Sequence, residues 1–193
     1  MQFFPSDYFT KLKKEEIFTD PKRPLEIDLG CGDGSFLINL AIKFPSKNFL
    51  GVERLLGRVR RVCRRSLKED LQNLKVLRLE SSYTLGWLLP DHCASRVHLL
   101  FPDPWPKKKH HKRRLVSEQF CASLVRVLEP SGEFLFKTDH LEYFEESMSV
   151  LKSFSSLEEI EWDPDFYYPM TDFEKVWNEQ GKNIYHARFK PKK

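Results

Sequence analysis

Residues 26–35, EIDLGCGDGS, decide how this chain folds. They continue an apolar run of strand length, and the helical pattern SFLINLAIKF begins at residue 35. Glycines at positions 30, 32 and 34 allow a sharp turn and let a ligand approach the backbone without interference from Cβ atoms. We expect Ser35 to cap the following helix. A strand, a glycine-rich turn and a helix in this order predict a βαβ unit.

The same alternation of strand and helix continues along the chain. It predicts a mostly parallel sheet with helices on both faces, which is an α/β fold. The expected strands are Pro24–Leu29, Asn48–Val52, Leu74–Leu79, Arg96–Phe101, Glu133–Lys137, Leu157–Trp162 and Ile184–Phe189. The expected helices are Ser35–Phe44, Arg54–Lys68, Arg114–Leu128 and His140–Phe154.

Length and composition point to one globular domain. The chain has 193 residues, 40% of them hydrophobic and 31% charged. We expect residues 1–20 to form an N-terminal arm and residues 21–193 a single domain. No apolar run approaches membrane-span length, and no secretory signal is visible, so we expect a cytoplasmic protein without a membrane partner. The four cysteines lack metal-site spacing, which predicts reduced, mostly buried thiols and no metal.

The net charge of +4 hides blocks of opposite sign. Residues 51–68 hold seven basic side chains and one acid, and residues 105–114 hold six basic side chains and no acid. Residues 140–180 hold eleven acids against two lysines. Basic blocks of this density suggest a polyanionic partner, although a solvated helix face explains the first block equally well.

Acidic residues gather at the predicted carboxyl ends of the strands, where ligands bind in open α/β sheets. Asp28 and Asp33 belong to the glycine loop, and Glu26 lies just before it. The glycine spacing is G-x-G-x-G, and these carboxylates would repel a pyrophosphate but suit a cationic ligand. Glu53 ends the second strand, where an acid grips ribose hydroxyls. Glu80 ends the third strand and either flanks a base or is an exposed turn residue.

A rigid loop follows the fourth strand. Residues 101–106 read FPDPWP, and three prolines restrict the backbone around Asp103 and Trp105. An acid beside an aromatic ring can bond the edge of a purine while the ring stacks on its face. The run KKKHHKRR at residues 107–114 then places positive charge beside this loop, as contact with a nucleic-acid backbone requires.

Two further patterns extend this site. Arg54, Arg58, Arg61 and Arg65 recur at helical spacing, so they share one face of the predicted helix. Near the C-terminus, Thr171 and Glu174 form a capping box at the start of a predicted helix. A capped helix start of this kind can also present Glu174 to a ligand.

These motifs together resemble one known family. The D-x-G-x-G-x-G loop is similar to that of class I S-adenosylmethionine-dependent methyltransferases. The segments FPDPWPKKKH, FKTD at 136–139 and TDFE at 171–174 resemble those of bacterial tRNA (guanine-N7-)-methyltransferases. The resemblance implies a Rossmann-like class I fold: a doubly wound, seven-stranded, mostly parallel sheet with a last antiparallel strand. It also implies methylation of guanine 46 in tRNA, by a monomer or weak homodimer.

The resemblance assigns roles by position. Asp103 is the expected catalytic residue. The expected contacts to S-adenosylmethionine are Glu26, Asp28, Gly30, Gly32, Gly34, Glu53, Glu80 and Asp103. The expected contacts to the substrate base are Lys107, Asp139, Thr171, Asp172, Phe173 and Glu174. The two basic blocks, rather than the resemblance, give the expected contacts to the RNA backbone, which are Arg54, Arg58, Arg61, Arg65, Lys108, Lys109, Lys112, Arg113 and Arg114.

Three other functions remain open at this point. The first is a dinucleotide-dependent oxidoreductase, which the acids of the glycine loop disfavour. The second is a protein with a methyltransferase fold that binds RNA without catalysis. The third is an exocyclic-amine N-methyltransferase, whose Asp-Pro-Pro-Tyr loop the Asp-Pro-Trp segment loosely resembles.

Overall fold

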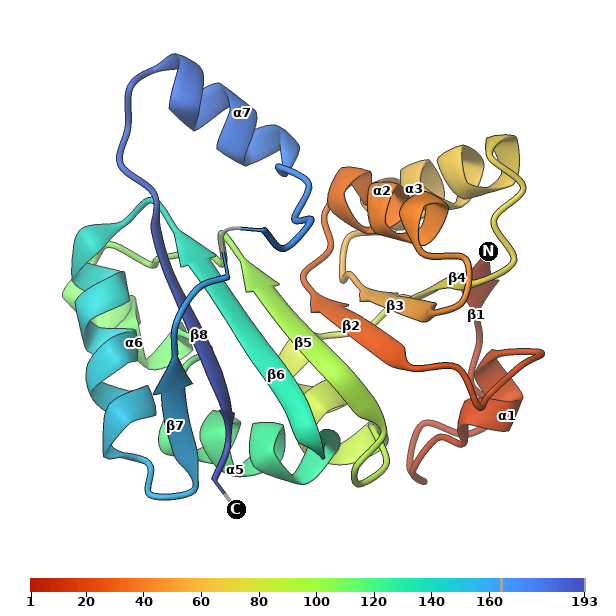
Figure 1. The fold of residues 1–193 in the computed structure, drawn as a ribbon, viewed down its shortest axis with the longest axis horizontal. Coiled ribbons are helices and arrows are strands. Elements are labelled where there is room, and N and C mark those ends of the chain that lie inside the picture. The colour runs from red at the N-terminus through yellow and green to blue at the C-terminus, as the bar shows by residue number, and fades with distance from the viewer. Residues whose placement is uncertain (164, 193) are drawn as a thin grey trace.

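The protein is an α/β sandwich built on one eight-stranded sheet (Figure 1). The computed structural model describes residues 1–163 and 165–192. The strands are β1 Gln2–Phe3, β2 Leu25–Leu29, β3 Asn48–Val52, β4 Leu74–Leu77, β5 Ala94–Leu100, β6 Leu128–Thr138, β7 Leu157–Ile160 and β8 Tyr185–Pro191. The α-helices are α1 Lys14–Ile17, α2 Ser35–Lys43, α3 Leu56–Lys68, α4 Ser81–Tyr83, α5 Glu118–Val127, α6 Leu141–Ser153 and α7 Asp172–Glu179. A π-helix, η1, covers Thr84–Leu88, and a 3₁₀ helix, η2, covers Lys108–Arg113.

The strand order is β1-β4-β3-β2-β5-β6-β8-β7. Strands β1 to β6 pair in parallel, and β8 runs antiparallel to both β6 and β7. The predicted α/β class and the antiparallel last strand are therefore confirmed. The seven predicted strands are present, and the short edge strand β1 is an eighth that the prediction missed. The order reverses between β2 and β5, so this is the point where a ligand cleft is expected.

Helices cover both faces of the sheet, so β2 and β3 are buried along their whole length, even though β2 carries Glu26 and Asp28. In β3, the successive side chains of Phe49 and Leu50 enter different hydrophobic clusters. The cluster with Phe49 contains side chains of α2 and α3, and the cluster with Leu50 contains side chains of η1, α5 and α6. Three of the four cysteines are buried, and all four are free thiols, as predicted.

The first 20 residues pack closely against the rest of the chain. Strand β1 pairs with β4, and the side chains of Leu12, Ile17 and Phe18 lie in the core. The Leu12 amide donates to the carbonyl of Leu88 at 2.8 Å. Whether these residues act as a separate arm, as the sequence suggested, stays a prediction. Within the described residues, no helix has both the length and the apolar character needed to cross a bilayer.

Helix α7 lies outside the sandwich. The chain leaves β7, passes above the carboxyl ends of β5 and β6 as α7, and returns to pair as β8 (Figure 1). Thr171 caps this helix, because its Oγ1 accepts from the Glu174 amide at 3.0 Å. This connection places residues 168–174 over the point where the strand order reverses.

We predict that the N-terminal segment contributes to global stability. Leu12→Ala should lower the free energy of unfolding by about 2–4 kcal/mol, because Leu12 is 3% exposed. Phe9→Ala is the matched control, because Phe9 is 78% exposed, and its effect should be about 0.5 kcal/mol or less. Urea denaturation measures both. Equal effects of the two substitutions would mean that the segment does not fold with the domain.

Candidate active site

A cleft opens at the carboxyl ends of β2, β3 and β5. It consists of two adjoining cavities of about 240 Å³ and 430 Å³ that share Gly30, Arg58, Leu100, Phe101 and Asp103. The smaller cavity is lined by the glycine loop and by Thr171, Asp172 and Phe173. The larger one reaches Glu53 and Glu80. Most of the residues that the sequence assigned to a cofactor therefore lie around one cleft.

The glycine loop has the backbone that its sequence requires. Gly30 and Gly32 have φ angles of +81° and +58°, and a Cβ atom on either would meet no atom within 4 Å. Gly34 has φ +78°, and its Cβ would lie 2.7 Å from Val62 of α3. Gly34 is the N-cap residue of α2, and the carboxylate of Asp33 accepts from the Ser35 amide at 3.3 Å. The prediction that Ser35 is the cap is wrong, because Ser35 is the first helical residue.

Two acids form the floor of the cleft. Both carboxylate oxygens of Glu53 are held by backbone amides, Oε2 by Gly32 at 3.1 Å and Oε1 by Leu55 at 2.7 Å. Asp28 is buried beneath the loop, and this burial, together with the neighbouring charge of Glu53, raises its pKa to about 7. An ionised Asp28 would therefore be stabilised by a cation in the cleft.

Glu26 does not line either cavity, in contrast to its predicted contact with the cofactor. It is 1% exposed within β2, and its carboxylate bonds Lys47, Arg96 and His98. Burial raises the pKa of Glu26, but the hydrogen bond from His98 and the cations around it outweigh this effect and lower it to about 2. Glu26 and Asp28 lie on the same face of β2, but Glu26 is two residues further from the carboxyl end of the strand than Asp28, which lines the smaller cavity. We therefore correct its assignment from cofactor contact to structural support.

Glu80 borders the larger cavity and also caps α4. Its Oε2 accepts from the Tyr83 amide at 2.8 Å and from the Ser82 hydroxyl at 2.5 Å. Both predicted roles, at the ligand cleft and at a turn, are compatible with this position. The second oxygen of Glu80 is the one that these contacts leave for a ligand.

The loop that carries Asp103 is strained on both sides. Phe101 and Trp105 have φ angles of +50° and +46°, a region that costs a residue with a Cβ atom on the order of 1–3 kcal/mol. Asp103 Oδ1 accepts from the Trp105 amide at 3.2 Å, which fixes the carboxylate at the cleft. Strain of this kind persists only where surrounding contacts hold the backbone in place.

Arg114 provides such a contact, and its predicted role in RNA binding is wrong. Its side chain is 1% exposed, so it cannot reach an RNA backbone. Its Nε donates to the Pro104 carbonyl at 2.9 Å, and its guanidinium pairs with Glu142 and Glu146 of α6. The last residue of the basic block thus ties the Asp103 loop to α6.

The rest of the basic block is exposed. Lys107, Lys108, Lys109, Lys112 and Arg113 are all exposed, as a phosphate-binding surface requires. The guanidinium of Arg113 stacks over the ring of Trp105 at 4.7 Å. One face of this ring is therefore covered, although the sequence suggested a free surface for a base.

The arginines of the α3 segment divide into two groups. Arg54 and Arg61 are exposed. Arg65 pairs with Asp33 of the glycine loop at 3.0 Å, and Arg58 lies 3.7 Å from Glu53 and lines both cavities. Arg58 and Arg65 therefore link α3 to the cleft. They do not form one outer face with Arg54 and Arg61.

The substrate-contact candidates also divide. Thr171, Asp172 and Phe173 line the smaller cavity, whereas Lys107, Asp139 and Glu174 do not line either cavity. Glu174 is buried, and its Oε1 accepts from Lys137 Nζ at 2.6 Å. Only the Thr171 half of the predicted capping box is formed, because the Glu174 carboxylate bonds Lys137 instead. Asp139 follows β6 directly and is half-buried.

Three residues near the cleft were missed by sequence reasoning. Lys137 pairs with Glu174, and the ring of Tyr168 lies 4.7 Å below its Nζ. His98 bonds both Glu26 and Tyr168. A lysine and a histidine inside otherwise apolar strands were the available signal, since such groups are buried only when paired.

The residues around the cleft fit S-adenosylmethionine. Its ammonium and sulfonium groups are cations, and Asp28 and Asp103 offer carboxylates beside a loop whose glycines leave room for a ligand. Its ribose hydroxyls need acceptors of the kind that Glu53 presents in the adjoining cavity.

We predict that Arg114 stabilises the Asp103 loop. Arg114→Met should lower the free energy of unfolding by about 2 kcal/mol, because it removes the bond to Pro104 and two ion pairs. Lys112→Met, two residues away and exposed, should change it by about 0.5 kcal/mol or less. Thermal or urea denaturation compares the two variants. If both substitutions lowered the free energy of unfolding by the same small amount, the contacts of Arg114 would contribute nothing to stability.

Comparison with known proteins adds independent information. The family model described as "Putative methyltransferase" matches residues 22–187. The solved structure of the aminoglycoside resistance methyltransferase NpmB1 superposes with a TM-score of 0.63 at 18% identity, over 94% of this chain and 95% of that chain. The antibiotic-resistance methyltransferase Kmr gives 0.64 at 14% identity, over 94% of each chain. These likenesses establish the class I methyltransferase fold.

Sequence relatives are more specific. A protein of Leptospira interrogans named tRNA (guanine-N(7)-)-methyltransferase is 35% identical, and the match covers 95% of this chain and 88% of the relative. A protein of Lactobacillus johnsonii with the same name is 33% identical, over 93% of this chain and 86% of the relative. The chain therefore belongs to the family of tRNA (guanine-N(7)-)-methyltransferases.

Proposed function

We propose that this protein transfers a methyl group from S-adenosylmethionine to N7 of guanine 46 in tRNA. The observation that carries the proposal is the carboxylate-lined cleft between β2 and β5, with the exposed basic segment 107–113 directly beyond its Asp103 loop. The names of the relatives support this reaction over RNA binding without catalysis and over methylation of exocyclic amines.

The cofactor would lie across both cavities. Asp28 would hold the ammonium group of its methionine part, and Glu53 the ribose hydroxyls. The backbone at Gly30 and Gly32 would pass beneath it, where no Cβ atom intervenes. Glu80 would flank the adenine from the far end of the larger cavity.

The chemistry requires alignment more than proton transfer. When bound, S-adenosylmethionine supplies an electrophilic methyl group on a sulfonium centre. Guanine N7 carries a free lone pair, so the protein has no proton to remove before attack, and its main task is to orient the base. Asp103 would stabilise the positive charge that develops on the alkylated purine. Asp139 and the segment Thr171–Glu174 would hold the edge of the base.

The RNA backbone would lie on the basic segment. Lys107, Lys108, Lys109, Lys112 and Arg113 are exposed beyond the Asp103 loop. Arg54 lines the larger cavity together with Arg113, and Arg61 is exposed on α3. No metal is needed for the transfer. We propose action in the cytoplasm, because tRNA is the substrate.

The proposal is tested with labelled S-adenosylmethionine and bulk tRNA. The wild-type protein should incorporate label, and aniline should then cleave the product at N7-methylguanine. Asp103→Asn removes one charge at the cleft and should lower kcat by about 100-fold, while the Kd of S-adenosylhomocysteine, whose sulfur is uncharged, changes by about three-fold or less. Label in the tRNA without aniline-sensitive sites would contradict N7 methylation, and normal turnover of the variant would remove Asp103 from catalysis.

Cofactor binding should depend on pH through Asp28. Its pKa of about 7 in the free protein means that it is largely protonated at pH 5.5, and a cationic ammonium requires the ionised form. The affinity for S-adenosylhomocysteine should therefore rise about ten-fold between pH 5.5 and pH 7, as one linked proton is released. Calorimetric titration measures this rise. Asp28→Asn should bind weakly with no such slope, and an unchanged slope in this variant would assign the titration to another group.

A further inference from the structure

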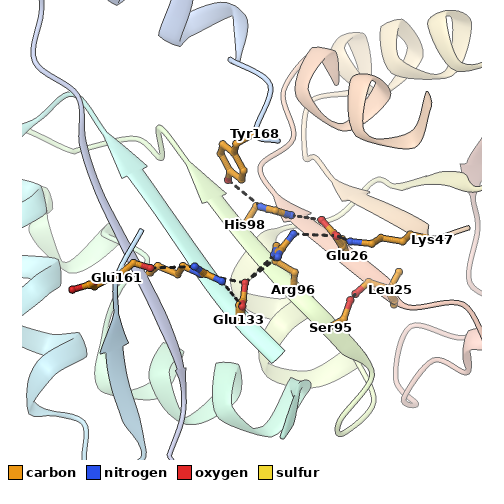
Figure 2. A network of polar contacts seen from close by, with 10 residues as sticks. Leu25, Glu26, Lys47, Ser95, Arg96, His98, Glu133, Glu161 and Tyr168 are labelled. Carbon is orange, nitrogen blue, oxygen red and sulfur yellow. Dashed lines mark hydrogen bonds and ion pairs between the residues drawn. The ribbon is translucent and has the colours of Figure 1, made fainter. Parts of the chain in front are cut away.

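A chain of hydrogen bonds runs from the centre of the sheet to the segment above the cleft (Figure 2). His98 of β5 is completely buried and bonds in both directions. Its Nε2 lies 3.0 Å from Glu26 Oε2 of β2, and its Nδ1 lies 3.0 Å from the Tyr168 hydroxyl. The connected residues are distant in sequence, and the third belongs to the segment that leads into α7.

The direction of each bond follows from charge. Glu26 is ionised, because Lys47 Nζ at 2.7 Å and Arg96 at 3.3 Å also bond its Oε1. His98 Nε2 must then carry the proton and donate to Glu26. Burial lowers the pKa of His98, so the ring is neutral and its Nδ1 is an acceptor. The Tyr168 hydroxyl therefore donates to His98, and the tautomer of the imidazole is fixed.

Ion pairs around Glu26 hold these hydrogen-bonded residues rigidly in the sheet. Arg96 bonds Glu26 and also Glu133 of β6, at 2.9 Å, and Glu133 in turn bonds Arg188 of β8 at 2.6 Å. These ion pairs cross β2, β5, β6 and β8 (Figure 2). A buried network with every charge paired has one low-energy arrangement, so it gives His98 a fixed position.

The ring of Tyr168 connects this ion-pair network to the residues around the cleft. It packs against Phe36 in the first turn of α2, with ring centroids 4.8 Å apart. Lys137 Nζ lies 4.7 Å above it and pairs with Glu174 at the start of α7. Tyr168 is three residues before Thr171, the first residue of the segment that lines the smaller cavity. None of Glu26, His98 and Tyr168 lines a cavity of the cleft itself.

We propose that Glu26, His98 and Tyr168 are positioning residues that hold segment 169–174 over the cleft in the geometry required for methyl transfer. The inference rests on the proposed function, because it assigns this segment to the base that reacts. It also assigns a function to Glu26, which does not line the cleft.

Tyr168→Phe tests this inference, because it removes only the hydroxyl and leaves the ring in place. Tyr167→Phe is the matched control: Tyr167 is exposed, and its ring packs on Phe44 with no hydrogen bond from its hydroxyl among the described residues. Hydrogen exchange measured by mass spectrometry, with S-adenosylhomocysteine bound, reports on the segment directly. The value of kcat/KM for tRNA and the Kd of the cofactor are also measured for both variants and for the wild-type protein.

We expect amides 170–180 of the Tyr168→Phe protein to exchange faster, while those of β2, β5 and β6 do not change. The value of kcat/KM for tRNA should fall about ten-fold, with a cofactor Kd within about three-fold of wild type. Tyr167→Phe should match wild type in both experiments. Identical exchange in the two variants would overturn the inference, as would faster exchange throughout the sheet, which indicates general destabilisation. The exchange result stands even if the wild-type protein methylates another substrate, so the two proposals can fail separately.

Discussion

The buried carboxylate of Glu26 imposes the constraint on which the rest of the structure depends. A charge in the middle of the sheet must be paired, because water does not reach it. The chain meets this requirement with Lys47 before β3 and with Arg96 and His98 of β5. These contacts join β2 to β5 where the strand order reverses. They add side-chain contacts to the backbone pairing of β2 with β5, directly below the loops that form the cleft.

The carboxylates of Asp28 and Glu53 repel each other in the cleft, and a cationic ligand would relieve this repulsion. Burial of Asp28 and, to a smaller extent, the nearby charge of Glu53 raise the pKa of Asp28. A cation would remove this penalty, whereas a pyrophosphate would increase it. The acids therefore select a positively charged cofactor. The exposed lysines of segment 107–112 lie beyond the Asp103 loop, whereas Arg54, Arg58 and Arg113 line the cleft beside the acids.

Much of this arrangement was predictable from local sequence. The glycine loop, the seven predicted strands and the helix capped by Thr171 follow from short-range rules that act within about ten residues. The basic segment 107–114 is connected to β5 through the Asp103 loop, and its contact with RNA stays a prediction. The family resemblance added the cofactor and the substrate, which local patterns alone left open.

The errors share one cause, which is that side-chain partners come from distant parts of the chain. Glu26 and Arg114 were assigned from charge and position, but the first is paired with β5 and the second with α6. Glu174 bonds Lys137 rather than its own helix cap. The pairing of β1 with β4 joins residues more than 70 positions apart, and nothing in a two-residue strand signals it. Contacts of this kind are set by the assembled sheet, so only the structure could reveal them.

A crystal structure of the protein with S-adenosylhomocysteine tests the central claim most directly. The account predicts the amino group of the ligand about 3 Å from the Asp28 carboxylate and its ribose on Glu53. It also predicts that Glu26 keeps its bonds to Arg96 and His98 and does not touch the ligand. A ligand that displaced these bonds to reach Glu26, or that bound away from the glycine loop, would contradict the account.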